Sequence, residues 1–191
     1  MKNMLFIMNP KAGRTTLKNS LVDVLEVFCN NDYAVRTYLT KSADDAERIV
    51  QEEGANYDVI VCAGGDGTLG STVTGYMKSG IMVPLGYIPC GSTNDFARSM
   101  DIPRETVEAA EMIVKAEPFS IDIGCLNDKN FVYVAAFGMF SDTSYATPQN
   151  MKNIFGHAAY VLQGIKSLAN VPSYKMKVTI DGDEQEGEFI F

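Results

Sequence analysis

The sequence predicts an α/β protein built on a doubly wound, mostly parallel sheet, followed by the start of an antiparallel β-sandwich. Apolar runs typical of buried strands alternate with segments of helical spacing through roughly the first two-thirds of the chain. Loops rich in glycine and polar residues, at residues 9–14, 64–68 and 89–94, each follow an apolar run. Near Phe119 the alternation gives way to short strands joined by polar turns. Because doubly wound sheets bind ligands at the carboxyl ends of their strands, the three loops should gather at one edge.

The α/β part is expected to contain four strands. Each is an apolar or alternating run bounded by turn-forming residues. The first, at the N-terminus, leads straight into polar residues and is too short for a signal peptide. We place the strands at residues 3–8, 33–39, 57–63 and 82–88.

The helices between these strands are predicted from apolar spacing and from their ends. The second begins at the acidic residues 43–45, soon after Thr40, as helix capping favours. Two others are expected over residues 69–79 and 103–115. The first helix presents one apolar face that consists of Leu17, Leu21, Val24, Leu25 and Phe28.

The rest of the chain is predicted to be antiparallel β structure with one helix. We therefore expect an α/β domain over residues 1–120 and the N-terminal part of a β-sandwich domain over residues 121–191. The chain stops at Phe191 in the middle of a strand, with an unpaired edge and little core, which predicts that it is a fragment or that its partner strands lie outside it. The expected elements are strands at 119–125, 130–137, 174–180 and 185–191, polar turns at 126–129 and 181–184, and a helix at 155–169.

The composition is that of an ordinary globular protein and argues against several functions. Hydrophobic residues make up 46% and charged residues 21% of the chain. No apolar run approaches the roughly 18 residues that a membrane span needs. The single histidine, His157, argues against Ser-His-Asp chemistry and multi-histidine metal sites. No C-x-x-C pair is present, so we interpret the cysteines as reduced residues in or near the core: Cys29, Cys62, Cys90 and Cys125.

The net charge of −8 argues against nucleic-acid binding, but the charge is unevenly distributed. Residues 143–178 contain four lysines and no Asp or Glu, with tyrosine and phenylalanine among them. This mixture suits an anionic or membrane interface. A solvated surface whose counter-charges come from elsewhere in the fold is the alternative.

The segment Gly-Gly-Asp-Gly-Thr at residues 64–68 indicates a phosphate site. It joins a predicted strand to a predicted helix, where glycine permits close approach of a ligand and backbone N–H groups can bind an anion. The carboxylate of Asp66 beside a phosphate suggests a divalent metal, because Mg²⁺ takes one or two carboxylates together with phosphate oxygens. No G-x-x-x-x-G-K-[ST] pattern is present. A tight turn without a ligand is the alternative interpretation.

Three motifs in series resemble a known family. They are N-P-x-x-G at residues 9–13, the segment 64–68, and P-x-G-S-x-N-D-F-A-R at residues 89–98. Together they resemble the catalytic domain of the diacylglycerol kinase-like lipid kinases, which include sphingosine and ceramide kinases, and above all its bacterial members. The resemblance continues to residues 145–148 and covers nearly the whole chain. It implies an ATP-dependent kinase with an α/β domain of the NAD kinase and diacylglycerol kinase type, a β-sandwich domain, and a site between them.

The resemblance also implies roles for individual residues. Asp66 would organise Mg²⁺ and the γ-phosphate of ATP, which makes it both the metal ligand and the catalytic residue of this chain. Asn94 and Asp95 stand at a predicted helix start and are alternatively capping residues. The residues implied to contact the nucleotide are Asn9, Pro10, Lys11, Ala12, Gly13, Arg14, Thr40, Gly64, Gly65, Asp66, Gly67, Thr68, Leu69, Gly91, Ser92, Asn94 and Asp95.

Two departures from the family pattern bear on activity. Family members usually follow residues 64–68 with a hydrophobic residue and then Asn-Glu, whereas this chain has Leu69 and then Gly70 and Ser71. The family's general base and structural Mg²⁺ ligands fall late in the β-sandwich domain, beyond Phe191. We therefore expect the chain as given to bind nucleotide poorly and to catalyse little.

The predicted function is an ATP-dependent lipid kinase that transfers the γ-phosphoryl group to a hydroxyl of diacylglycerol or a related lipid. Its cofactors would be ATP and Mg²⁺, and its partner a lipid substrate at a membrane surface, with no nucleic acid and with a homodimer as one oligomeric state to test. The expected location is the cytoplasm, in peripheral contact with the membrane. Two alternatives stay open: an NAD kinase-like enzyme, and a nucleotide-binding regulator without catalysis.

Overall fold

The computed structural model describes residues 1–12, 16–127, 129–135 and 173–190. The chain divides into two compact units, residues 1–134 and 135–191, and each is described by itself. The predicted helix at 155–169 and most of the lysine-containing stretch lie outside the described residues. The predicted domain boundary at residue 120 stays a prediction.

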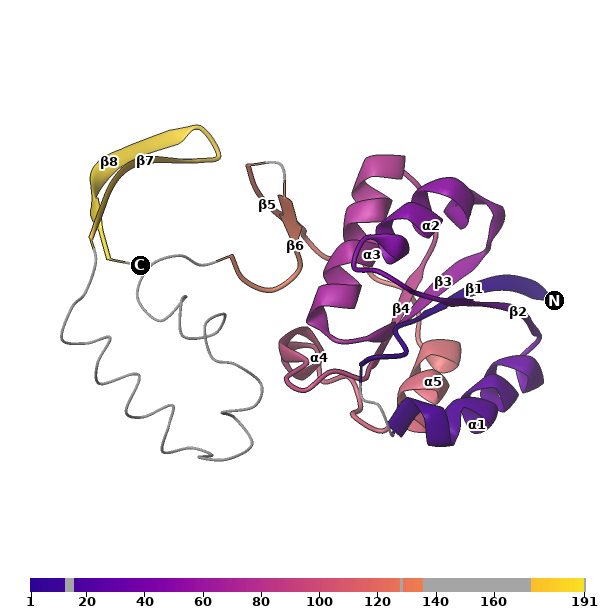
Figure 1. The fold of residues 1–191 in the computed structure, drawn as a ribbon. Helices are drawn as coiled ribbons and strands as arrows, with labels where there is room; N and C mark the ends of the chain where they lie inside the picture. Colours follow the sequence, from indigo (N-terminus) through magenta and orange to yellow (C-terminus); the bar gives the residue numbers. More distant parts are fainter. Residues whose placement is uncertain (13–15, 128, 136–172, 191) are drawn as a thin grey trace, which may run out of the picture. The chain divides into compact units, whose positions relative to one another are not determined.

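The first unit contains a four-stranded sheet in which every neighbouring pair is parallel (Figure 1). The strand order is β2-β1-β3-β4, so the chain moves outward from β1 to β2 and then starts again on the other side of β1. This confirms the predicted doubly wound sheet and places its change of direction between β1 and β3. The strands are β1 (Lys2–Met8), β2 (Tyr33–Leu39), β3 (Val59–Gly64) and β4 (Leu85–Pro89).

Helices cover both faces of this sheet (Figure 1). α1 and α5 pack together on one face, and α2 and α3 pack together on the other. The helices are α1 (Thr16–Asn30), α2 (Asp45–Glu53), α3 (Asp66–Ser79), α4 (Asp95–Ser99), α5 (Thr106–Lys115) and a short 3-10 helix, Gly54–Asn56.

Alternate residues of the central strands supply two apolar cores. In β1, Met4 and Phe6 belong to the core under α1 and α5, whereas Leu5 and Ile7 belong to the core under α2. All four are fully buried. Successive side chains of a strand point to opposite faces, so a strand that is apolar on both faces requires a helical layer on each side. The apolar run at residues 3–8 is continuous because both faces of β1 are covered by helices.

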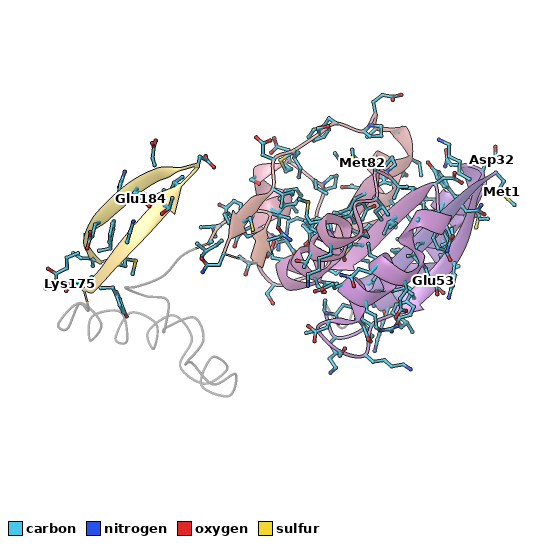
Figure 2. All side chains as sticks on the ribbon, turned by 90° about the horizontal axis from the view of Figure 1, so that it is seen from above. Met1, Asp32, Glu53, Met82, Lys175 and Glu184 are labelled. Atoms are coloured by element: carbon cyan, nitrogen blue, oxygen red, sulfur yellow. The ribbon has the colours of Figure 1, made fainter. Side chains whose placement is uncertain are left out.

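β4 and α5 begin three residues later than predicted. β4 begins at Leu85 rather than at residue 82, because Pro84 has no N–H to donate to the ladder. Met82, labelled in Figure 2, is 95% exposed. α5 begins at Thr106 rather than at residue 103, because Glu105 stays extended as its N-cap.

The two strands that follow α5 within the first unit are short. β5 (Gly124–Leu126) and β6 (Lys129–Phe131) overlap the predicted ranges 119–125 and 130–137, of which residues 136 and 137 lie outside the described residues, and the two strands pair antiparallel. Phe119 is 69% exposed, and no strand of the described residues lies beside it to continue the ladder. Residues after α5 nevertheless join the core: Ile123 and Val132 pack against the cluster around α3.

In the second unit the described residues form one hairpin, β7 (Tyr174–Ile180) and β8 (Asp183–Phe189). Figure 2 labels Lys175 and Glu184, which lie toward its opposite ends. The turn has two residues, Asp181 and Gly182, both at positive φ, rather than the predicted four. Such a turn matches the twist of paired strands and favours Asp-Gly. β8 therefore begins at Asp183, two residues before the predicted start.

The cysteines divide into two pairs. Cys62 and Cys90 are buried, and burial raises the pKa of their thiols to about 12 and about 11. These two therefore stay protonated and form part of the core, as predicted. Cys29 and Cys125 are exposed, so the predicted placement near the core is wrong for them.

Candidate functional site

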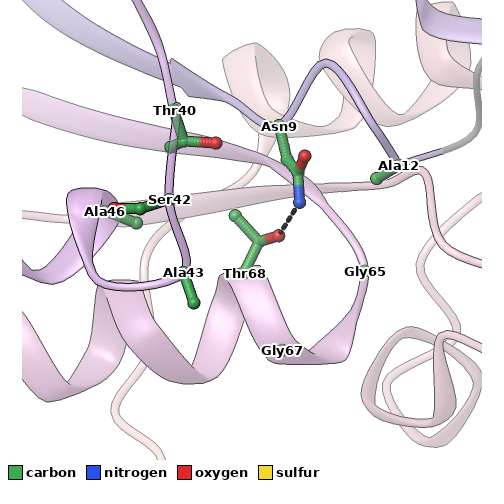
Figure 3. Close-up of a pocket in the computed structure, with 9 residues that line it drawn as sticks. All are labelled: Asn9, Ala12, Thr40, Ser42, Ala43, Ala46, Gly65, Gly67 and Thr68. Atoms are coloured by element: carbon green, nitrogen blue, oxygen red, sulfur yellow. Dashed lines mark hydrogen bonds between the residues drawn. The ribbon is translucent and has the colours of Figure 1, made fainter.

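A pocket of about 340 Å³ opens at the carboxyl ends of β1, β2 and β3 (Figure 3). It lies at the point where the strand order changes direction, between β1 and β3, which is the usual ligand position in doubly wound sheets. Among the described residues that line it, no side chain carries a charge. The lining residues are Asn9, Ala12, Thr40, Ser42, Ala43, Ala46, Gly65, Gly67 and Thr68.

Asn9 fastens the loop after β1 to the start of α3. Its Nδ2 donates to Thr68 Oγ1 at 3.0 Å, the bond drawn in Figure 3, while its Oδ1 accepts from the Lys11 backbone N–H at 2.9 Å. Its carbonyl accepts from the N–H of Ala12 at 3.1 Å. Asn9 therefore shapes the loop after β1 and joins it to α3, the helix that follows the neighbouring strand β3.

The segment from β2 into α2 forms a second wall. The Thr40 N–H donates to the Met8 carbonyl at 2.9 Å, which extends the β1–β2 pairing to the pocket. The carboxylate of Asp45 accepts from the backbone N–H groups of Lys41 at 2.6 Å and Ser42 at 3.2 Å. These bonds, helped by the guanidinium of Arg48 at 3.5 Å, hold the pKa of the Asp45 carboxyl below its ordinary value. A charged carboxylate thus fixes this wall.

Ser71, which with Gly70 replaces the Asn-Glu usual in the family, ties α3 to the start of α2. Its Oγ donates to the Ala43 carbonyl at 3.0 Å and accepts from the Glu47 N–H at 3.1 Å. Asp44, the N-cap residue of α2, makes no side-chain cap bond. The serine therefore supplies from α3 the acceptor that an N-cap side chain commonly provides.

The start of α3 forms the third wall and differs from the prediction. Gly65 is the N-cap, and its carbonyl accepts from the N–H groups of Thr68 at 2.9 Å and Leu69 at 3.1 Å, so α3 begins at Asp66. Residues 66–68 are its first turn rather than a turn before it. Gly67 lines the pocket, and a Cβ on it would meet no atom within 4 Å. The pocket therefore ends on bare backbone at a helix N-terminus.

The carboxylate of Asp66 points to a second helix. Its Oδ1 accepts from the backbone N–H of Phe96, in the first turn of α4, at 3.3 Å. No described residue bonds its Oδ2 in the structure, and no cluster of three or more His, Cys, Asp or Glu suitable for a metal occurs among the described residues. Asp66 is thus a single carboxylate beside the helix terminus, with one oxygen engaged and one open.

The loop after β4 folds against the start of α3. The N–H of Cys90 donates to the Gly64 carbonyl at 2.7 Å. Asn94 is 4% exposed and lies in the left-handed region, at φ 54°. Its Oδ1 accepts from the Gly91 N–H at 2.8 Å and its Nδ2 donates to the Gly91 carbonyl at 2.9 Å. The amide of Asn94 therefore closes its own loop.

The structure brings together part of the predicted set. The pocket includes Asn9, Ala12, Thr40, Gly65, Gly67 and Thr68. It does not include Pro10, Lys11, Gly64, Asp66, Leu69, Gly91, Ser92, Asn94 and Asp95. Gly13 and Arg14 lie outside the described residues. Sequence reasoning missed Ser42, Ala43 and Ala46, which the position after β2 could have indicated although that segment has no glycine.

Fold and site together define a class: doubly wound α/β proteins whose ligand site lies at the change of strand direction and ends on a glycine-lined helix N-terminus. Comparison with known proteins then identifies the family. Residues 3–126 match the diacylglycerol kinase catalytic domain, and the chain belongs to that family.

The relatives agree in sequence and in structure. Diacylglycerol kinase from Staphylococcus aureus (strain JH9) is 35% identical in an alignment of 191 positions that covers 98% of this chain and 60% of that protein. The crystal structure of a diacylglycerol kinase from Bacillus anthracis (strain Sterne) superimposes with a TM-score of 0.73 at 26% identity, covering 99% of this chain and 62% of that one. A second structure from the same strain gives a TM-score of 0.79 at 29% identity. The chain thus spans less than two-thirds of the length of these relatives.

Proposed function

We propose that this chain forms the nucleotide-binding part of an ATP-dependent lipid kinase, which transfers the γ-phosphoryl group of ATP to a hydroxyl of diacylglycerol or a related lipid. The observation that carries the proposal is the glycine-lined start of α3 at the base of the pocket. Kinase chemistry is supported by the family, and the lipid acceptor is supported by the names of the relatives.

The pocket has the features that a nucleotide triphosphate needs. The N–H groups in the first turn of a helix lack intrahelical partners and attract phosphate, as the helix dipole does. Gly65 and Gly67 line this end of the pocket without side chains. Since no side chain of the described lining residues is charged, the phosphate contacts proposed here come from the backbone. The nucleoside would lie toward the small side chains of Ala12, Ala43 and Ala46.

A divalent metal fits the same end of the site. Mg²⁺ commonly takes one or two carboxylates and completes its shell with phosphate oxygens and water. Asp66 offers one carboxylate with one open oxygen beside the helix N-terminus. Bound there with ATP, Mg²⁺ would neutralise phosphate charge, which is the main requirement of phosphoryl transfer.

The part of these residues in the reaction would be to hold ATP and Mg²⁺ and to orient them. The bond between Asn9 and Thr68 joins the loop after β1 to the start of α3, on either side of the proposed phosphate position. Asp66, which accepts from the Phe96 N–H, would hold the Mg²⁺. Among the described residues that line the pocket, none is a carboxylate or a histidine, and we propose that the base that accepts the proton of the lipid hydroxyl lies elsewhere in the full-length protein.

The proposed acceptor is a lipid at a membrane surface, reached by a cytoplasmic protein in peripheral contact, with no nucleic acid involved and with a homodimer as one arrangement to test. In the described part of the chain, every helix is too short or too polar to cross a bilayer. The stretch 143–178 is the proposed lipid-facing region, and residues 143–172 of it lie outside the described residues.

The proposal is tested by supplying labelled ATP and Mg²⁺ to the full-length protein with a panel of acceptors: diacylglycerol, ceramide and sphingosine in mixed micelles, and NAD in solution. Labelled lipid is the expected product. Labelled NAD alone would show an NAD kinase-like enzyme. Nucleotide binding in calorimetry with no labelled acceptor would indicate a regulator without catalysis.

A further inference from the structure

The two glycine loops, residues 64–68 and 89–94, share one tyrosine beneath them. Tyr87 lies on β4, opposite Cys62 of β3, and is 4% exposed. Its hydroxyl donates to the Gly64 carbonyl at 3.1 Å and lies 3.4 Å from Asn94 Oδ1, also within hydrogen-bond reach. One buried hydroxyl therefore contacts the backbone of the first loop and the side chain that closes the second.

The remaining contacts of Tyr87 keep this hydroxyl in place. Its ring packs in the cluster that contains Leu69 and Ala97, and its centroid lies 6.2 Å from that of Phe96. Burial, reinforced by the charge of Asp66, raises the pKa of the phenol, so the hydroxyl stays protonated and remains a donor. Tyr87 does not line the pocket, so it can act on a ligand only through the loops.

The loops leave little freedom for any other arrangement. A Cβ on Gly91 would stand 2.6 Å from the Cα of Gly65, so the two backbones already touch. The Gly64 carbonyl also accepts from the Cys90 N–H. Tyr87 is thus the second donor to the Gly64 carbonyl. That carbonyl belongs to the peptide that joins Gly64 to Gly65, so the two bonds orient the N-cap residue of α3.

We propose that Tyr87 is a positioning residue for phosphate binding: its hydroxyl holds the two glycine loops in the arrangement that aims the first turn of α3 at the ligand. This rests on the proposed function for the identity of the ligand, a nucleotide triphosphate. The juxtaposition of the loops does not rest on it. A satisfied core tyrosine would stabilise the fold equally but would leave ligand affinity unchanged.

The test compares Tyr87→Phe with Tyr76→Phe in the full-length protein. Tyr76, on α3, donates its hydroxyl to the Pro84 carbonyl at 3.3 Å, away from both loops. Each substitution removes one tyrosine hydroxyl bonded to a backbone carbonyl and keeps the ring. Affinity for ATP with Mg²⁺ is measured by calorimetry, and backbone amide exchange is measured without ligand.

We expect Tyr87→Phe to weaken ATP binding by roughly three- to ten-fold, the equivalent of one neutral hydrogen bond, and to speed exchange at the Cys90 and Gly91 amides by a similar factor. Tyr76→Phe should change neither. Equal effects of both variants, or wild-type affinity and exchange in Tyr87→Phe, would overturn the proposal. If the wild-type protein bound no ATP, the proposed function would fail, and amide exchange alone would decide whether Tyr87 holds the loops.

Discussion

Gly65 and Gly91 come from different loops, and their backbones meet. A Cβ added to Gly91 would lie 2.6 Å from the Cα of Gly65, and one added to Gly65 would lie 3.2 Å from the Cα of Gly91. Neither residue has a positive φ, so space rather than backbone conformation demands glycine. The glycines that the sequence analysis assigned to ligand approach therefore also serve approach between two loops.

Replacement of Gly91 should disturb the junction of the loops. In Gly91→Ala the new methyl group would press on the Gly65 backbone and on Asn94 Oδ1, 2.7 Å away. Overpacking of this kind costs about 1–3 kcal/mol of unfolding free energy, and ATP affinity should fall with it. Urea unfolding and calorimetry measure the two effects.

Gly70→Ala is the matched control, because a Cβ there would meet no atom within 4 Å and the residue lies inside α3. Alanine should stabilise the helix by about 0.5–1 kcal/mol. Equal stability changes of the same sign in the two variants would contradict the close approach as the cause.

Asp66→Asn should abolish phosphorylation and leave the fold intact. The amide oxygen of asparagine can still accept from the Phe96 N–H, but the charge proposed to hold Mg²⁺ is lost. A fall in turnover on the order of 100-fold or more is expected, as when a preorganised electrostatic group is removed from an active site. Turnover is measured with labelled ATP and diacylglycerol, and folding by circular dichroism.

Asp58→Asn controls for the loss of a structural carboxylate. Asp58 also accepts one backbone N–H, from Asn3 at 2.7 Å, but it lies just before β3, at the opposite end of the sheet from the pocket. Wild-type turnover in Asp66→Asn, or the same loss in Asp58→Asn, would rule out the metal role of Asp66.

The sequence predicted the layers of this fold better than the partners within its site. The run over residues 3–8 and the loops that follow strands depend on local composition, and the structure confirms them. The bond between Asn9 and Thr68 joins residues far apart in the chain, as does the bond between Asp66 and Phe96. Spacing and propensity carry no signal for such pairs, because tertiary packing brings them together. Met82 shows a different kind of error. The sequence analysis assigned this apolar residue to a strand, but it is exposed, because β4 begins only after Pro84.

Ser71→Ala should loosen the joint between α3 and the pocket wall at Ala43. The variant loses both bonds of the hydroxyl, one of them to the first turn of α2, and such a cap contributes typically about 1 kcal/mol to the free energy of unfolding. Thr74→Ala is the control, since its Oγ1 bonds the Gly70 carbonyl, within α3 itself. That variant should stay within about 0.5 kcal/mol of the wild type in urea unfolding. An equal loss in both variants would show that Ser71 acts through α3 alone.

The pocket wall at the start of α2 should weaken in acid through Asp45. The N–H groups of Lys41 and Ser42, with the guanidinium of Arg48, hold the pKa of its carboxyl below the ordinary value of 3.8, so the folded protein binds this proton more weakly than the unfolded chain. The stabilisation is therefore complete above pH 3.8 and is lost as the pH falls below it, through the lowered pKa of the folded state. Melting temperatures of the wild type and Asp45→Asn should differ most at neutral pH and converge in acid. Asp44→Asn, which removes a charge at the same helix end but no cap bond, should show no such convergence. If the difference in melting temperature between the wild type and Asp45→Asn stayed constant down to pH 3, the charge of this carboxylate would not be what holds the pocket wall.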